Sequence, residues 1–157
     1  MPQHPDPDTF GFLVTDLSRL IRAEMDRRIS DAGLGLTPGE GRTLVYAARA
    51  GEVRQIELAE RMGVEPMTLS SYLDRLEARG LVERKPDPTD RRAKLVALTA
   101  AAEGVLDQVR DVGTRMRADI SRHIAAVDWE QLNAGLLQAR DALVAMRAAQ
   151  LRESDAA

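Results

Sequence analysis

Two short helical patterns joined by a tight turn, with a strand-like hairpin directly after them, restrict the fold of this chain more than any other feature. The first pattern spans 55–62 and is closed by Gly63, a residue that permits the turn. The second begins at Pro66, since proline fits the first turn of a helix, and it ends at Gly80. Two short helices with so brief a connection are typical of a helix-turn-helix.

The second helix has an apolar face and a polar face. Three leucines fall within about 60° of arc at ~100° per residue and predict the buried stripe: Leu69, Leu73 and Leu76. Four side chains form the polar face or its edge: Thr68, Ser71, Tyr72 and Arg75. Hydroxyl groups and a guanidinium suit base edges and phosphates, so these four are candidate DNA-binding residues. Taken alone, the polar face is equally compatible with the solvated side of an ordinary amphipathic helix.

The hairpin that follows concentrates positive charge in a short stretch. Segments 81–85 and 94–98 are predicted as strands, separated by the turn-rich stretch 86–90. A slim basic arm suits the DNA minor groove, whose negative potential attracts arginine, and the hairpin therefore predicts the wing of a winged helix. Its candidate DNA-binding residues are Arg84, Asp90, Arg91, Arg92 and Lys94. Asp90 would be repelled by phosphates unless it pairs with an arginine and fixes the orientation of that arginine.

Long amphipathic patterns lie on both sides of this lobe. The predicted organisation is a winged helix-turn-helix at 36–99, a helical dimerisation region at 8–33 and 100–150, a disordered tail at 1–7 and a frayed C-terminus at 151–157. Thr37 and Glu40 predict a capping box, and Thr99 is expected to cap the helix after the hairpin. The long apolar stripes favour partner helices from a second copy over a monomeric bundle. The predicted fold class is mainly α with a small β-hairpin wing.

Composition argues against several classes of function. The 157 residues include no cysteine and only two histidines, so a disulfide, a thiolate nucleophile or a conventional zinc site is not expected. The chain also lacks a Ser-His-Asp set and a phosphate-binding glycine loop, which argues against an enzyme and against a cofactor. No apolar run approaches the ~18 residues of a membrane helix, and residues 1–8 lack the build of a signal peptide, so a cytoplasmic protein is expected.

Three stretches of the sequence carry a resemblance to a known family. They read ELAERMGV from Glu57, LDRLEARGLVER from Leu73, and DPTDRRAKLVALT from Asp87. Together they resemble the MarR/SlyA family of bacterial transcription regulators over Leu36–Thr99, and the flanking helices fit in position and length. The Asp-x-Arg wing followed by a Leu-Thr closing strand is the specific part of this signature, whereas the helix-turn-helix alone is not.

The resemblance implies a homodimer that binds a pseudo-palindromic operator in double-stranded DNA. Arg92 matches the wing arginine that enters the minor groove, and Asp90 matches its acidic companion. Members of the family mostly repress transcription, and many release DNA when a small aromatic or phenolic compound binds between the dimer helices and the DNA-binding lobe. The candidates for such an effector pocket are Phe10, Phe12, Leu13, Tyr46 and Met116, all of which are equally compatible with a place in the core.

Three positions depart from the family pattern. Many relatives carry an arginine where Ser71 stands, so an operator sequence cannot be transferred to this chain. Gly41 replaces a common bulky aromatic residue, and Ala102 a common glycine. Lacking cysteine, the chain does not resemble the thiol-based peroxide sensors of the family.

The competing function is a helical module whose winged helix binds protein in place of DNA. The salt dependence of binding separates the two functions, because only DNA binding should weaken steeply with salt.

Overall fold

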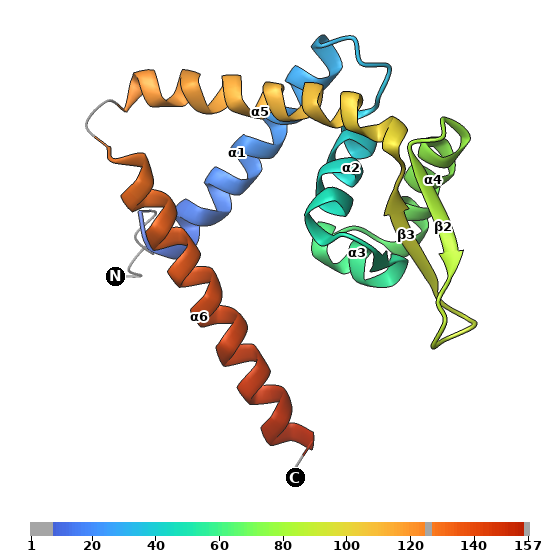
Figure 1. Ribbon diagram of the computed structural model, residues 1–157. Helices are drawn as coiled ribbons and strands as arrows, with labels where there is room; N and C mark the ends of the chain where they lie inside the picture. The colour runs from blue at the N-terminus through green and yellow to red at the C-terminus, as the bar shows by residue number, and fades with distance from the viewer. Residues whose placement is uncertain (1–7, 125–126, 156–157) are drawn as a thin grey trace, which may run out of the picture. The chain divides into compact units, whose positions relative to one another are not determined.

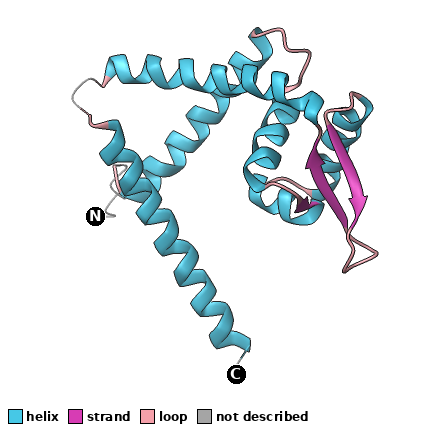
Figure 2. Ribbon diagram, in the orientation of Figure 1, coloured by secondary structure: helices cyan, strands magenta, loops and turns pink. Residues whose placement is uncertain are grey.

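The computed structural model describes residues 8–124 and 127–155, and shows a mainly helical chain with one small antiparallel sheet (Figures 1 and 2). The expected fold class is therefore confirmed. In chain order the elements are α1 (Phe10–Asp31), α2 (Pro38–Ala50), β1 (Val53–Arg54), α3 (Gln55–Met62), α4 (Pro66–Ala78), β2 (Val82–Pro86), β3 (Lys94–Leu98), a 3-10 turn (Ala100–Ala102), α5 (Glu103–His123) and α6 (Trp129–Asp155). The chain divides into two compact units between Met116 and Arg117. The expected tail at 1–7 lies outside the described residues.

Local signals set most of the helix ends. The capping box before α2 is confirmed: the Thr37 side chain accepts from the Glu40 N–H, and the Glu40 side chain accepts from the Thr37 N–H. Gly63 ends α3 with φ +63°, a left-handed conformation that glycine adopts without steric cost. The expected cap at Thr99 is wrong. Its hydroxyl donates to the Gly80 carbonyl at 2.5 Å, so it ties the end of β3 to the end of α4, and a 3-10 turn precedes α5.

The sheet has three strands in the order β1-β3-β2, one more than the sequence indicated. β2 and β3 form the expected hairpin, with Val82 opposite Leu98 and Arg84 opposite Val96. The additional strand β1 is only two residues long and pairs Val53 with the opposite edge of β3 at Val96. So short a strand has no periodicity to detect, and it exists because β3 offers it backbone partners.

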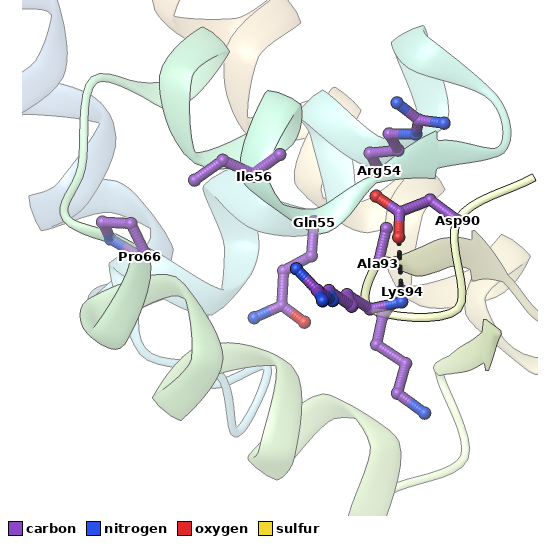
Figure 3. A pocket seen from close by; sticks show the side chains of 8 residues that line it. Arg54, Gln55, Ile56, Pro66, Asp90, Ala93 and Lys94 are labelled. Carbon is purple, nitrogen blue, oxygen red and sulfur yellow. Dashed lines mark hydrogen bonds between the residues drawn. The ribbon is translucent and has the colours of Figure 1, made fainter. Parts of the chain in front are cut away.

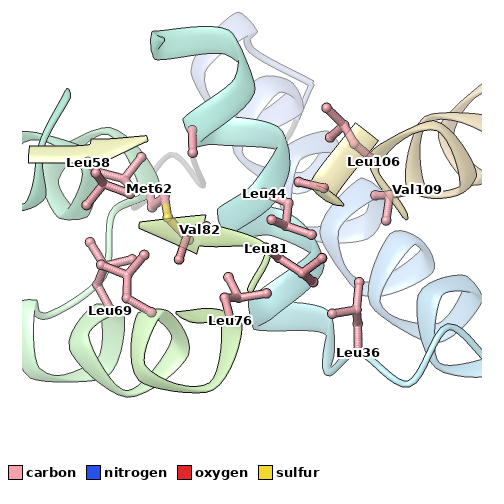
Figure 4. Packing of buried hydrophobic residues seen from close by; sticks show 14 of the residues in the cluster. Leu36, Leu44, Leu58, Met62, Leu69, Leu76, Leu81, Val82, Leu106 and Val109 are labelled. Atoms are coloured by element: carbon pink, nitrogen blue, oxygen red, sulfur yellow. The ribbon is translucent and has the colours of Figure 1, made fainter. Parts of the chain in front are cut away.

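The core of the first unit lies under the helix-turn-helix and the sheet (Figure 4). The predicted leucine stripe of α4 is fully buried there, at 0% exposure for each of its three members. Leu44 of α2 and Leu58 of α3 meet the stripe from the neighbouring helices, and Val82 and Val96 from the sheet. Because the apolar side of α4 is used in this way, its polar side is turned to solvent.

The second unit contains the end of α5 and all of α6. Asp128 accepts from the N–H groups of Glu130 and Gln131, which caps the start of α6. The indole of Trp129 donates to the Ser121 hydroxyl at 2.8 Å and lies under the Arg117 guanidinium. The helix continues to Asp155, through part of the expected frayed end. Among the described helices, none combines the length and the apolar character needed to cross a membrane.

Candidate nucleic-acid interface

The turn between α3 and α4 fixes how α4 is presented. The Gly63 N–H donates to the Glu60 carbonyl and the Val64 N–H to the Ala59 carbonyl, both at 3.1 Å. Ala59 is 1% exposed, so its small side chain lies against its neighbours in the core. On the outer side of α4, Thr68, Ser71 and Arg75 are exposed and Tyr72 is partly buried. The structure thus brings the four α4 candidates to the solvent side of one helix.

Arg75 is not a freely moving side chain. Its Nε donates to the Glu40 carboxylate of α2, and its Nη1 donates to the Ser71 hydroxyl at 3.3 Å. Its guanidinium carbon lies 5.6 Å from the centre of the Tyr72 ring, within cation–π distance. The polar side of α4 is therefore an ordered arrangement of side chains, and Glu40 is one of its members that the sequence did not indicate.

The tip of the hairpin is held by a cluster around Asp87, a residue that is only 5% exposed. One carboxylate oxygen of Asp87 accepts from the Thr89 N–H and the Thr89 hydroxyl, both at 2.7 Å, and from the Asp90 N–H at 3.2 Å. The other oxygen accepts from Arg54 Nε of β1 at 2.6 Å. Arg54 also donates to the Thr89 hydroxyl at 3.0 Å. We call Arg54, Asp87 and Thr89 the Asp87 cluster.

Sequence reasoning did not single out the Asp87 cluster. The sequence could have indicated the pairing of Asp87 with Thr89, because aspartate followed two residues later by threonine is typical of a turn supported by side-chain hydrogen bonds. The partner Arg54 is 33 residues earlier in the chain and carries no local mark. Through this partner, the hairpin tip is tied to the strand that leads directly into α3.

Asp90 bonds an arginine of the wing through the backbone of that residue. Its carboxylate accepts the backbone N–H of Arg92 at 3.0 Å, shown as the dashed line in Figure 3. Asp90 therefore supports the turn that carries Arg91 and Arg92, while in the same turn Asp87 binds the side chain of Arg54. Arg91 and Arg92 themselves are exposed at the tip.

A cleft of about 360 Å³ separates the hairpin from the helix-turn-helix (Figure 3). Arg92 and Lys94 line it from the hairpin, Gln55 and Ile56 from α3, and Pro66 from the start of α4. Two cations of the hairpin thus face the side of the lobe on which α4 begins, and Arg54 and Asp90 line the same cleft.

Arg84 does not join this group. It lies at the base of the hairpin, where its guanidinium bonds Glu77 at 2.5 Å and Asp74 at 2.7 Å, both on α4. Glu77, and then Asp74, raise the pKa of Arg84 above its ordinary value. Lys85 similarly pairs with Glu83 at 2.6 Å. The positive charge that is not compensated by such pairs lies nearer the tip, at Arg91, Arg92 and Lys94.

Comparison with known proteins agrees with this geometry. The MarR family model matches residues 36–94, the helix-turn-helix and most of the hairpin. The transcriptional regulator PA3341 is 32% identical, with 88% of this chain aligned to 98% of that chain and a TM-score of 0.68. The chain belongs to the MarR family.

Two further structures show how widely the fold is shared. A MarR-family transcriptional regulator from Silicibacter pomeroyi is 28% identical over 85% of this chain and 86% of that one, with a TM-score of 0.68. A cysteine-to-serine mutant of MarR from Escherichia coli, complexed with operator DNA, is 23% identical over 85% and 92%, with a TM-score of 0.63. At that identity the second likeness establishes the winged-helix fold and nothing finer.

The five effector-pocket candidates of this MarR-family chain lie in different surroundings. Phe10, Phe12 and Leu13 are exposed on the first turns of α1, by 63%, 51% and 46%. Tyr46 of α2 packs against the core, and Met116 of α5 is buried. Three of the five therefore face solvent in the single chain. Within the described residues, no group of three or more histidine, aspartate or glutamate side chains could hold a metal ion.

The Asp87 cluster makes a prediction about acid stability. Hydrogen bonds from Thr89, and then from Arg54, hold the pKa of Asp87 well below its ordinary value of 3.8. A carboxyl group whose pKa is lower in the folded protein than in the unfolded chain stabilises the fold at pH values above its ordinary pKa. This stabilisation is lost as the pH falls toward the folded-state pKa. We expect Asp87→Asn to be less stable than wild type at pH 7, and this difference to shrink below pH 3.8. Urea midpoints measured from pH 7 to pH 2.5 would show it.

The control for this experiment is Asp111→Asn, a substitution of an exposed aspartate on α5. Its urea midpoint should follow that of wild type over the same pH range. A difference between wild type and Asp87→Asn that stayed constant down to pH 2.5 would contradict the assignment, because the carboxylate charge would then contribute nothing.

Proposed function

We propose that this chain is a sequence-specific DNA-binding transcriptional regulator that acts as a homodimer. The observation that carries the proposal is the pairing of an exposed, ordered polar face on α4 with a basic hairpin tip that the Asp87 cluster ties to the same lobe. An α-helix fits the major groove, and a slim arm that ends in arginine fits the narrow minor groove beside it. The operator complex of the Escherichia coli protein supports this use of the fold.

The roles of the candidate residues follow from their positions. Thr68, Ser71, Tyr72 and Arg75 would face base edges and the adjoining phosphates from α4. Arg92 would enter the minor groove, with Arg91 and Lys94 close to phosphates and Asp90 holding the turn. We assign Arg84 to support of the wing, because its guanidinium is already bonded to two carboxylates of α4.

The homodimer rests on apolar side chains that the single chain leaves in solvent. Along α1 the exposed large hydrophobic residues are Phe10, Phe12, Leu13, Val14, Leu17, Leu20 and Ile21. Along α6 they are Leu132, Leu136, Leu137, Leu143, Val144, Met146 and Leu151. Soluble monomers rarely expose apolar patches of this extent. A second copy with the same helices would cover them, and it would also place two winged lobes for the two halves of a palindrome.

We also propose that the regulator represses transcription and that a small aromatic or phenolic compound releases it from DNA. The support is the membership of the MarR family together with Phe10 and Phe12, aromatic side chains that stand unburied at the start of α1. A partner chain that covers α1 would enclose them, and Tyr46 and Met116 would then complete the lining. This is a binding function, and no step of it calls for a catalytic residue.

The experiment that tests the proposal is selection of binding sites from randomised duplex DNA with the full-length protein. We expect a palindrome whose half-sites lie about one helical turn apart. Binding to the selected site should weaken steeply with salt, with a log–log slope of about −0.9 for each phosphate neutralised. A failure to enrich any sequence would reject a sequence-specific regulator and favour a winged helix that binds protein.

A further inference from the structure

We propose that Glu40 of α2 determines sequence specificity by positioning Arg75 of the recognition helix α4. The inference rests on the proposed DNA-binding function and adds a residue that lies outside α4 and outside the wing. Glu40 would contact no DNA itself. It would hold the guanidinium of Arg75 in one orientation, from which the remaining N–H groups can bond a base edge.

The Glu40 carboxylate is fixed before it reaches Arg75. Glu40 is 4% exposed, and it belongs to the capping box of α2. Its Oε2 accepts the Thr37 N–H at 2.9 Å, while its Oε1 accepts from Nε of Arg75. Burial acts to raise the pKa of Glu40, but the bonds from Thr37 and Arg75 outweigh it, and the net pKa lies below the ordinary value. The group is therefore a charged, immobile acceptor at neutral pH.

Arg75 is held from more than one side. Its Nη1 donates to Ser71 at 3.3 Å, and the Tyr72 ring lies 5.6 Å from its guanidinium carbon. The Tyr72 ring in turn lies against Gly39, where an added Cβ would come within 2.3 Å of it. Only glycine leaves room for the ring at this position, beside the glutamate that binds Arg75. The start of α2 and the middle of α4 are thus in direct contact around this side chain.

The arrangement leaves Arg75 partly available. A guanidinium has five N–H donors, and the described contacts with Glu40 and Ser71 engage two of them. The side chain is still 51% exposed. An arginine whose rotamer is already fixed loses less conformational entropy when it binds, and it can satisfy only the base edge that matches its geometry. A mobile arginine in the same place would bond phosphates and several bases with little preference.

Glu40→Gln separates this role from the capping role. The glutamine amide oxygen can accept the Thr37 N–H, so the capping box is retained. The amide nitrogen then faces Arg75 and cannot accept its Nε–H. The matched control is Glu57→Gln on α3, where the half-buried glutamate pairs with Arg61 of the same helix at 2.5 Å. The control removes the same charge from an ion pair that lies within α3.

The readout is the ratio of dissociation constants for the selected operator and for a set of operators with single base-pair changes. We expect Glu40→Gln to reduce discrimination about 5- to 10-fold at one or two base pairs in each half-site and to leave the other positions unchanged. Glu57→Gln should keep the wild-type ratios. In an Arg75→Ala background, Glu40→Gln should have no further effect on them, because Glu40 acts through Arg75.

The proposal would be overturned if Glu40→Gln left base-pair discrimination unchanged. It would also be overturned if Glu40→Gln reduced discrimination equally in the wild-type and Arg75→Ala backgrounds. If wild type selects a palindrome and Glu40→Gln behaves like it, only the positioning role fails. If wild type selects no sequence, the proposed function fails and the positioning role with it. Thermal melting shows whether each variant is folded. Should Glu40→Gln unfold, Glu40→Asp tests the same contact, since it keeps the carboxylate charge but shortens the side chain that reaches Nε of Arg75, and it should lose discrimination at the same base pairs.

Discussion

Arg92→Ala is expected to weaken binding to the selected operator by about 100-fold or more. A hydrogen bond to a charged group contributes roughly 1.5–3 kcal/mol, which is about 10- to 100-fold for each wing, and a dimer would insert two wings. Arg92 is exposed at the tip, and its backbone N–H, which Asp90 accepts, remains in the alanine variant. The fold and the dimer should therefore be unaffected. Gel-shift titrations at several salt concentrations would measure both the affinity and its salt slope.

The matched control is Arg110→Ala, which removes an exposed arginine from α5 that pairs with Asp107 of the same helix. Its affinity for the operator should stay within about twofold of wild type. The salt slope of Arg92→Ala should also be shallower, since fewer counterions are released when fewer cations meet the DNA. An affinity of Arg92→Ala equal to that of the control would remove Arg92 from the interface and leave Arg91 and Lys94 as the cations of the wing.

Leu17→Asp is expected to raise the dissociation constant of the dimer by at least about 100-fold. Leu17 lies in the middle of the exposed apolar set of α1 and is 54% exposed in the single chain. A dimer that covers this set would bury two unpaired carboxylates, each at a cost of several kcal/mol. Light scattering or sedimentation at micromolar concentration would show a monomer. Operator affinity should fall with it, because a single lobe contacts one half-site.

The neighbouring substitution Ser18→Asp is the control, since it adds the same charge one position along the helix. It should leave the dimer intact. A dimeric Leu17→Asp protein would show that the apolar set of α1 is not the interface. A wild-type chain that is itself monomeric would favour the alternative in which the long helices cover one another within one molecule.

The elements that were predicted from the sequence are those with local signals. The helix Gln55–Met62, the start of α4 at Pro66 and the capping box of α2 were all confirmed, because each depends on residues a few positions apart. The MarR family was also identified from sequence alone, through the Asp-x-Arg wing. The errors concern contacts between distant parts of the chain. Strand β1 exists only by pairing with β3, and the Thr99 hydroxyl found a carbonyl 19 residues away.

The same distinction applies to the candidate site. Residue type and helical spacing were enough to nominate the polar side of α4 and the cations of the hairpin. They could not indicate which cations are already neutralised by carboxylates, as Arg84 is by Glu77. Nor could they reveal Glu40 and Arg54, whose partners lie 35 and 33 residues away in the sequence. Both pairs are defined by packing of α2 and β1 against the DNA-binding elements.

The position of Arg54 has a consequence for protein engineering. The hairpin spans 82–98, yet the arginine that binds Asp87 belongs to a strand before α3. A chimera that exchanges only the hairpin between two family members would separate the turn from its partner whenever the recipient lacks arginine at the position of Arg54. A transferable wing therefore consists of two stretches of sequence, the hairpin and residues 53–54, and both have to be moved together.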